Sequence, residues 1–501
     1  MNATDQKTTA VRSEGWQPPL SRRPVNATVE HLATAVLAQR RLPTSAASRR
    51  FVLLLTWIYC LSWAADFRGE QGGSVFQMLT FAITAGTGVV MTIVGWSVLF
   101  RRPMGWLILL WSVFLASTAV VAQVQHVVVG NYLRTIIPWL LVLTSMIVCQ
   151  VASGFGISLR QMLLPMLVAC ALNVGWRAFY ALAISGVAPE IVRVEMLSQC
   201  LPLLMALLMC GLFLQRTWPL WPVLLGGLGI ASYVFSITRS AVFIIGAALV
   251  GAVIALIVSC RSGKIDSGFI KAKLRHIITV PIALLAAMLL FGTAAPFVIE
   301  RWEERLFHSV GSEYTSMDPS TLTRLAETGA FIKILDGDPL NYAFGMGIGQ
   351  KYYWDEAYAV ELAYTYGNVD IFRSDFREIW FPGHAIWTYA IFSGGFFSLL
   401  MHTAFFAGAI GIAWKAGKRA VATGAVPLHL AWLPFVGMLA FVSASLTFNP
   451  FIERAAGLVL GFIAALPQFI LRDALKLAAV KRQAVRILVT PVLSNPHHLP
   501  A

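Results

Sequence analysis

The sequence contains little charge. Only 12% of its 501 residues are Asp, Glu, Lys or Arg, whereas 57% are hydrophobic and the mean hydropathy is +0.71. A typical soluble domain carries about 25% charged residues. The shortage therefore excludes an ordinary soluble globular domain and indicates a chain that crosses a membrane several times.

Acidic residues are especially scarce. There are 24 Asp and Glu residues against 38 Lys and Arg residues, which gives a formal net charge of +14. Such an excess would suit a nucleic-acid-binding protein, but most of the basic residues lie in short stretches between apolar runs, where they act as topology signals. We therefore expect a lipid bilayer as a partner and no nucleic acid.

The sequence also lacks a recognisable cysteine framework and a signal peptide. The six cysteines lie in or beside apolar runs, and their spacing matches neither a metal site nor a set of disulfides. Residues 1–50 are polar and basic and lack the apolar core of a cleavable signal peptide. We expect a disordered cytoplasmic tail over this stretch.

Long apolar runs are abundant, each near the ~20 residues that a membrane-spanning helix needs. About twelve of them lie near 51–65, 74–100, 104–124, 135–155, 163–187, 200–215, 219–236, 240–259, 277–298, 385–413, 428–448 and 455–471. They predict an all-α polytopic membrane protein. Transmembrane helices 1–9 would occupy residues 51–298, helices 10–12 would occupy 385–471, and a cytoplasmic tail would follow over 472–501.

The distribution of basic residues sets the expected orientation. If the N-terminus is cytoplasmic, the cytoplasmic connections and both tails hold most of the Lys and Arg residues, and the short outer loops hold few. Both termini are then cytoplasmic, and one long loop, 299–384, lies on the outer face. Because the other outer loops are short, we expect extracytoplasmic chemistry in this loop.

The long loop contains a predicted helix. Asp318 can cap it and Pro319 can be its first residue, whereas Gly337 and Pro339 end it. An apolar stripe recurs along one face at Leu322, Leu325, Gly329 and Ile332. Arg324 falls off this stripe near the helix start, where it could bind an anion together with the positive helix end. A solvated surface arginine is the plainer interpretation.

Two further arginines stand out. Arg239 in "SITRSAVF" lies in the shortest outer connection between two predicted spans. It is either an ordinary interfacial arginine or part of a site. Arg177 lies inside the fifth predicted span, where an arginine costs about 2.5–3.5 kcal/mol on the insertion scale. We expect it to face a cavity or a partner, or to reach the outer interface.

Short motifs in the loop allow more than one interpretation. The turn "FGMGIGQ" at 344–350 could aim backbone N–H groups at a phosphate or could be a plain tight turn. "DGD" at 336–338 is better explained as a helix stop before a proline than as a metal site, so we expect no metal and no cofactor. Tyr353, Trp354 and Tyr364 suit a sugar-lined groove and a membrane interface equally.

His384 lies in "PGHAIWTYAIFSGGF", where the loop enters the tenth predicted span. Either this histidine is merely interfacial, or it faces a reaction centre at the membrane surface. His402 would lie about 27 Å further along the same helix, at ~1.5 Å per residue, and thus too deep to share that site.

Three elements therefore follow one another in a fixed order. They are the short connection with Arg239, the segment "STLTRLAETGAFIKILDGDPLNYAFGMGIG" with Arg324, and the segment "PGHAIWTYAIFSGGF" with His384. This order resembles the O-antigen ligase and O-antigen polymerase family of bacterial membrane glycosyltransferases over roughly 219–413. In the family pattern an asparagine follows the histidine, but Ala385 stands there in this chain. Another group would have to take its place, and Thr388, one turn later, is the candidate.

The resemblance implies a GT-C fold in the bacterial inner membrane. It implies transfer of a glycan from undecaprenyl pyrophosphate to an acceptor hydroxyl at the periplasmic face, without a metal and with inversion. Arg239, Arg324 and Arg177 would bind the pyrophosphate. His384 would take the acceptor proton or orient the pyrophosphate.

Two activities share this pattern. A polymerase joins glycan repeats to each other, and a ligase transfers the finished glycan to lipid A-core. The aromatic-rich loop, with room for a second glycan chain, favours the polymerase. A polysaccharide or lipid transporter is the alternative of another class, but it would favour internal repeats and midplane charges. No repeat is evident, and Arg177 is the only clear charge inside a predicted span.

Overall fold

The structure is a computed structural model. It describes residues 45–493, except for 66–74, 101–102, 182–195, 216–219, 237, 240, most of 264–301, 304–318, 359–360, 362–377 and 380–381. The chain divides into two compact units. Pro43–Leu475 forms the larger unit, and the described part of the other is the remainder of the last helix, α20 (Pro467–Leu493).

The larger unit is built of helices. In chain order they are α2 (Ala46–Ser62), α3 (Val75–Val94), α4 (Gly105–Val124), α5 (Val129–Gly154), α6 (Leu159–Phe179), α8 (Leu201–Leu214), α9 (Leu220–Ser236), α10 (Ala241–Arg261), α13 (Pro319–Leu335), α14 (Pro339–Phe344), α17 (Ile386–Thr423), α18 (Leu428–Thr447), α19 (Arg454–Ala465) and the start of α20. Short 3-10 turns lie at Trp96–Val98, Glu356–Tyr358 and Pro450–Ile452. The two-residue strands β1 (Tyr352–Tyr353) and β2 (Glu378–Ile379) pair antiparallel.

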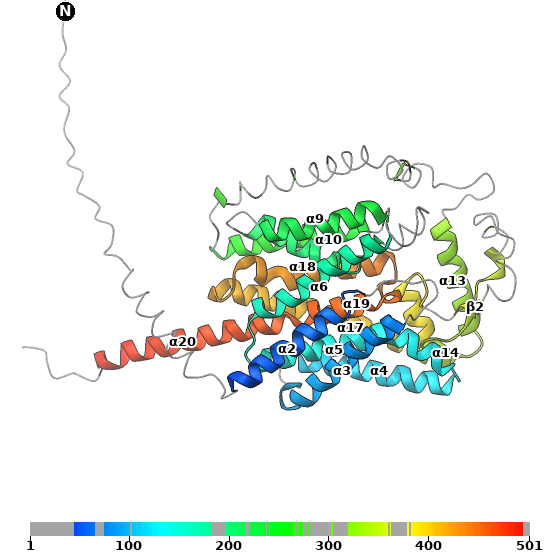
Figure 1. Ribbon diagram of the computed structural model, residues 1–501, viewed down its shortest axis with the longest axis horizontal. Coiled ribbons are helices and arrows are strands. Elements are labelled where there is room, and N and C mark those ends of the chain that lie inside the picture. The colour runs from blue at the N-terminus through cyan, green and yellow to red at the C-terminus, as the bar shows by residue number, and fades with distance from the viewer. Residues whose placement is uncertain are drawn as a thin grey trace, which may run out of the picture. The chain divides into compact units, whose positions relative to one another are not determined.

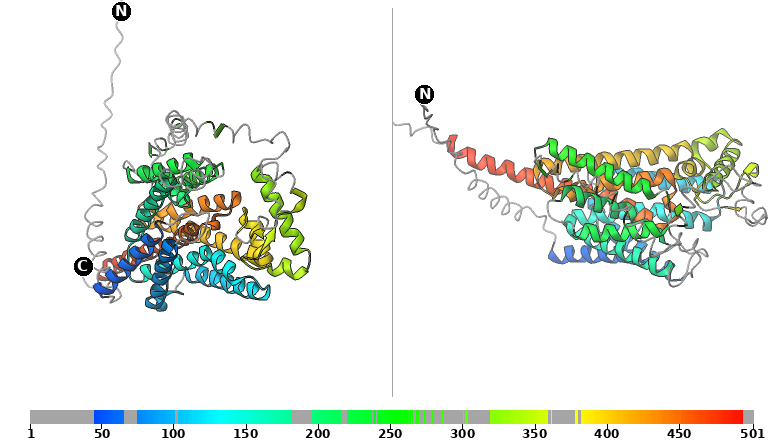
Figure 2. Two further views of the ribbon diagram at one scale, coloured as in Figure 1. Left: turned by 45° about the vertical axis from the view of Figure 1, so that its right-hand side comes forward. Right: turned by 90° about the horizontal axis from the view of Figure 1, so that it is seen from above.

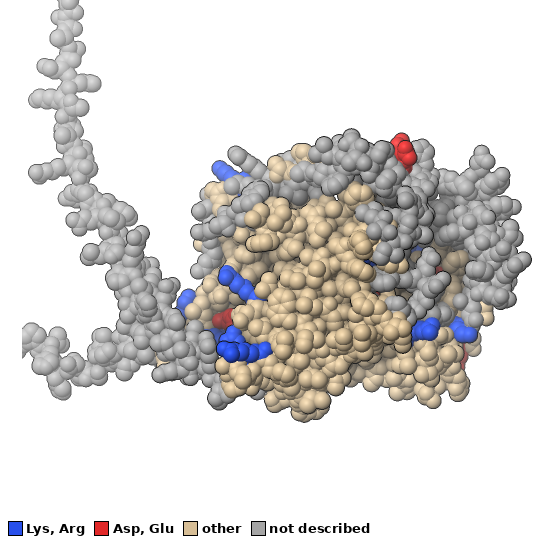
Figure 3. All heavy atoms as spheres, in the orientation of Figure 1, with Lys and Arg blue, Asp and Glu red and all other residues tan. Residues whose placement is uncertain are grey.

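Eight helices among the described residues are long and apolar enough to cross a membrane. The chain is therefore an all-α, multi-pass membrane protein, as predicted. Each predicted span except the ninth coincides with a helix, although α2, α8 and α9 are too short to count among the eight. The ninth, at 277–298, lies mostly outside the described residues, so the number twelve stays a prediction. In Figure 3 the charged side chains in view gather toward two ends, with an uncharged band between them.

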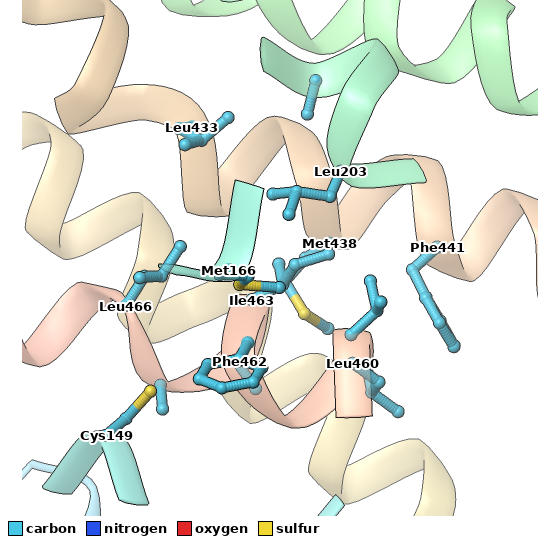
Figure 4. Packing of buried hydrophobic residues seen from close by; sticks show 14 of the residues in the cluster. Cys149, Met166, Leu203, Leu433, Met438, Phe441, Leu460, Phe462, Ile463 and Leu466 are labelled. Carbon is cyan, nitrogen blue, oxygen red and sulfur yellow. The ribbon is translucent and has the colours of Figure 1, made fainter. Parts of the chain in front are cut away.

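Small residues hold the bundle core together. A Cβ at Gly457 would lie 1.8 Å from the carbonyl oxygen of Pro138, and one at Gly461 would lie 2.4 Å from that of Val142. The GxxxG spacing thus lets α19 pack directly on the backbone of α5. Figure 4 shows Leu460, Phe462 and Ile463 of α19 among buried apolar side chains of neighbouring helices.

The helices of the long loop, α13 and α14, lie together at one end of the bundle (Figures 1 and 2). We call this the loop end. The helix boundaries agree with the sequence pattern: α13 ends at Leu335, and Asp338 caps α14 by accepting a hydrogen bond from the N–H of Leu340 at 2.9 Å. "DGD" is therefore a helix stop and a helix cap.

Helix α17 is not the straight rod that the sequence predicted. Gly394 and Gly395 have non-helical dihedral angles, with φ of −147° and +63°. The rings of Trp387 and Phe406 lie 5.9 Å apart, whereas 19 residues of straight helix would separate them by about 28 Å. The estimate of 27 Å between His384 and His402 is wrong for the same reason.

The glycine-rich turn fills this break. The N–H groups of Met346 and Gly347 donate to the carbonyl oxygens of Phe392 (2.7 Å) and Ser393 (2.9 Å), which the break frees from helical bonding. The N–H of Gly345 donates to Asn341 within α14. These backbone groups already have partners, so the interpretation of the turn as a phosphate cradle is wrong.

Candidate functional site

The buried face of α13 differs from the predicted apolar stripe. The side chains that point inward are Leu322, Thr323, Ala326, Glu327, Ala330 and Phe331, whereas Leu325 and Ile332 are exposed. Both sets have helical spacing, so periodicity alone did not choose between them. The observed register buries one carboxylate, that of Glu327, which is 2% exposed.

Glu327 accepts hydrogen bonds from three donors. The His384 ring lies against Oε1 through Nδ1 at 2.7 Å, and the Tyr352 hydroxyl donates to the same oxygen at 3.3 Å. The backbone N–H of His384 donates to Oε2 at 2.8 Å. A buried carboxylate is costly unless it is hydrogen-bonded, and these bonds offset that cost.

The arrangement fixes the orientation of the His384 ring. Because a carboxylate can only accept, Nδ1 carries the proton and Nε2 presents its lone pair in the neutral ring. The side chain is 45% exposed, so the ring remains accessible. We call the His384–Glu327 pair the dyad. It has the geometry of a general base held by an acidic partner.

The approach to the dyad is tight. Pro382 and Gly383 are buried, and a Cβ at Gly383 would lie 3.1 Å from Oε2 of Glu327 and 3.2 Å from the ring of Phe331. A glycine therefore lets the backbone bring His384 N–H onto the carboxylate. The role suggested for Thr388 is not observed, since its hydroxyl donates to the Ala385 carbonyl at 3.2 Å. Glu327 orients the histidine instead.

Tyr352 closes the other side of the carboxylate. Its ring packs against Phe331 and Phe392, with centroids 4.8 and 5.5 Å away. Burial and the adjacent Glu327 carboxylate raise the pKa of the Tyr352 hydroxyl well above its usual value. The hydroxyl therefore keeps its proton at any physiological pH and always acts as a donor to Glu327.

Arg324 lies one turn before Glu327, so the two residues share one side of α13. Arg239 lies in the turn between α9 and α10, where its carbonyl oxygen accepts from the N–H of Val242 at 3.1 Å. Both arginines are half-buried. That the two guanidinium groups share one site stays a prediction.

Arg177 has a partner inside the bundle. Its Nη2 lies 2.6 Å from Oε2 of Glu453, and its Nη1 donates to the carbonyl oxygen of Leu197 at 2.6 Å. The two side chains are 1% and 7% exposed. Of the alternatives that the sequence left open for Arg177, the structure selects a protein partner.

The aromatic candidates are placed differently from one another. Tyr353 is 54% exposed on β1, whereas Trp354 is half-buried and packs on Leu322 and Ala326 of α13. Tyr364 lies outside the described residues. No group of three or more metal-ligating side chains occurs within the part of the chain that the structure describes.

Glu327 is the residue that sequence reasoning missed. A signal was present in "TLTRLAETGAF", because the small residues Ala326 and Ala330 follow Leu322 at intervals of four. That register places Glu327 beside the buried stripe. A comparison of the chain with family models finds no match, and a comparison with curated proteins finds none either.

Proposed function

We propose that this protein is a membrane glycosyltransferase of the O-antigen polymerase type, with a GT-C fold. It moves a glycan from undecaprenyl pyrophosphate to an acceptor hydroxyl at the periplasmic face of a bacterial inner membrane. The observation that carries the proposal is the dyad, an accessible imidazole whose Nδ1 is held by a buried carboxylate.

This transfer requires a base for the acceptor hydroxyl and positive charge beside the departing pyrophosphate. His384 Nε2 takes the proton of the acceptor hydroxyl as its oxygen attacks the anomeric carbon, and Glu327 stabilises the imidazolium that forms. The bond from the anomeric carbon to the pyrophosphate oxygen breaks on the opposite face, which gives inversion. The protein supplies no metal in this mechanism.

Arg324 and Arg239 stabilise the departing pyrophosphate. A guanidinium makes planar, paired hydrogen bonds to phosphate oxygens and stays charged at every relevant pH. Arg324 is the better supported of the two, since it lies one turn before Glu327 on α13. Arg177 has a different role in this proposal, because its guanidinium is bound to Glu453 and to a carbonyl group.

Polymerase and ligase differ in the acceptor, and the exposed Tyr353 supports the polymerase as a ring on which a second glycan chain can lie. A deletion strain separates the two activities. Single repeats on the lipid carrier identify a lost polymerase, whereas full-length chains on that carrier identify a lost ligase.

The direct test is transfer of lipid-linked glycan by purified protein in excess chelator. We expect His384→Ala to lower the rate by about 10²–10⁴, the usual effect of losing a general base. Alanine at His429, a histidine of α18 outside the dyad, is the matched control and should keep the rate. Equal rates for wild type and His384→Ala would refute the proposal.

A further inference from the structure

The hydroxyl of Tyr352 and the ring of His384 compete for one oxygen. Both groups bond to Oε1 of Glu327, at 3.3 Å and 2.7 Å, while Oε2 accepts the backbone N–H of His384. The backbone bond fixes the position of the carboxylate. The hydroxyl bond instead draws negative charge away from the oxygen that faces the imidazole.

We infer that Tyr352 is a positioning residue that sets the basicity of His384 through Glu327. With the hydroxyl in place, Oε1 shares its charge between two donors, and the imidazolium gains less from it. The base then releases its proton more readily after each turnover. The inference deepens the proposed function, since it concerns the same histidine.

Among the described residues, two groups near the dyad have partners other than Oε1. Tyr389, one turn into α17, accepts the N–H of Gly349 at 3.2 Å. On α13, Lys333 is paired with Asp355, and Arg324 lies one turn before Glu327. The direct bond of Tyr352 is thus a contact through which a single hydroxyl can act on the carboxylate.

The substitution Tyr352→Phe removes the hydroxyl and keeps the ring against Phe331 and Phe392. The readout is acylation of His384 by diethyl pyrocarbonate, which reacts with neutral imidazole, followed by peptide mass spectrometry over a range of pH. This measurement needs no substrate. We expect the midpoint of labelling to rise by about 0.5–1 pH unit, a factor of about three to ten in the protonation equilibrium.

The matched control is Tyr342→Phe. Tyr342 on α14 also donates its hydroxyl to a carboxylate, that of Asp336, but this carboxylate lies outside the dyad. The same chemical change should therefore leave the labelling midpoint of His384 in place. The shift from Tyr352→Phe should also vanish when Glu327 is replaced by glutamine, because the charge that transmits it is gone.

A fluorinated tyrosine at position 352 gives a second test that preserves the hydroxyl and the packing. Fluorination makes the hydroxyl a stronger donor, so the midpoint should fall rather than rise. An unchanged midpoint in both variants, or an equal shift in the Glu327→Gln background, would overturn the inference. If the midpoint shifts as expected but wild-type protein transfers no glycan, the inference stands and the proposed function fails.

Discussion

Among the described residues, the pairs Arg177–Glu453 and His384–Glu327 both join distant parts of the chain, and they differ in one respect. Arg177–Glu453 links α6 to the start of α19 with both side chains buried. His384–Glu327 links the segment before α17 to α13 with one partner buried and the other 45% exposed. A pair with both side chains buried, which we call closed, can only hold segments together. A pair with one exposed side chain, which we call open, can also exchange a proton with a substrate.

The difference follows from local backbone structure. Glu453 and Leu197 both lie just outside helices, and Arg177 reaches both from within α6. His384 instead sits beyond the end of a broken helix, where the glycine-rich turn bonds to the carbonyl groups of the break. The first pair should therefore govern stability, and the second should govern activity.

The largest expected effect concerns the open pair. Glu327→Gln keeps the size of the side chain but removes the charge that holds Nδ1–H, so we expect glycan transfer to fall by about 10²–10⁴ with little loss of folded protein. The assay is transfer per folded molecule. Asp336→Asn, the same change at an exposed carboxylate after α13, is the control and should be mild. A wild-type rate of glycan transfer by Glu327→Gln would show that the open pair does not govern activity.

The closed pair gives the converse prediction. Arg177→Ala leaves Glu453 buried and unpaired, which should lower the free energy of unfolding by about 3–5 kcal/mol. Thermal unfolding of the purified protein measures this loss. Replacing Arg177 and Glu453 together by leucine should recover part of it. A fully stable Arg177→Ala protein without glycan transfer would contradict the structural role and favour a substrate role.

Arg324 sharpens the contrast, because it shares α13 with Glu327. We expect Arg324→Ala to lower transfer by about 10²–10³, by analogy with loss of an oxyanion donor. Arg324→Lys should rescue little, since an ammonium cannot reproduce a bidentate fork. Transfer assays at saturating and limiting lipid-linked substrate will separate binding from turnover. Full activity in both variants would remove Arg324 from the site.

The helical content, the positions of most spans and the end of α13 at "DGD" could be predicted, because each depends on local composition or turn residues. The break in α17 could not be read from Gly394 and Gly395 alone, since its geometry depends on the turn that packs into it. Glu327 was missed for a similar reason. Two helical stripes fitted α13, and only packing against Tyr352 and His384 selects one.

The break itself can be tested at Gly395. Its φ of +63° is unfavourable for other residues, and a Cβ there would lie 2.3 Å from the backbone of Ala343. Gly395→Ala should therefore lower the free energy of unfolding by roughly 1–3 kcal/mol and disturb the backbone that positions the dyad. Gly411→Ala, where nothing lies within 4 Å, is the control in the same helix and should be neutral or slightly stabilising. Equal unfolding temperatures for the two variants would contradict the packing of the glycine-rich turn into the break of α17.

The smallest expected effect lies away from the dyad, at the pair formed by exposed Lys333 of α13 and buried Asp355. The hydrogen bond from Lys333 and that from the N–H of Ala357 hold the pKa of Asp355 below its usual value. The carboxylate therefore stabilises the fold above its unfolded pKa of about 3.9, and this stabilisation is lost as the pH falls through the lower folded value.

Lys333→Ala should weaken the loop end by about 0.2–1 kcal/mol at neutral pH, because water screens the exposed ammonium group. The loss should shrink as the pH is lowered, because the protonated carboxyl no longer attracts an ammonium group. Hydrogen exchange at the N–H of Asp355, which donates to the Ala326 carbonyl at 3.1 Å, reports this locally. Lys418→Ala, at an exposed position of α17, should leave that exchange rate unchanged. If Lys333→Ala destabilised the protein as much as Arg177→Ala does, the exposure of one partner would not explain why one pair contributes less to stability than the other.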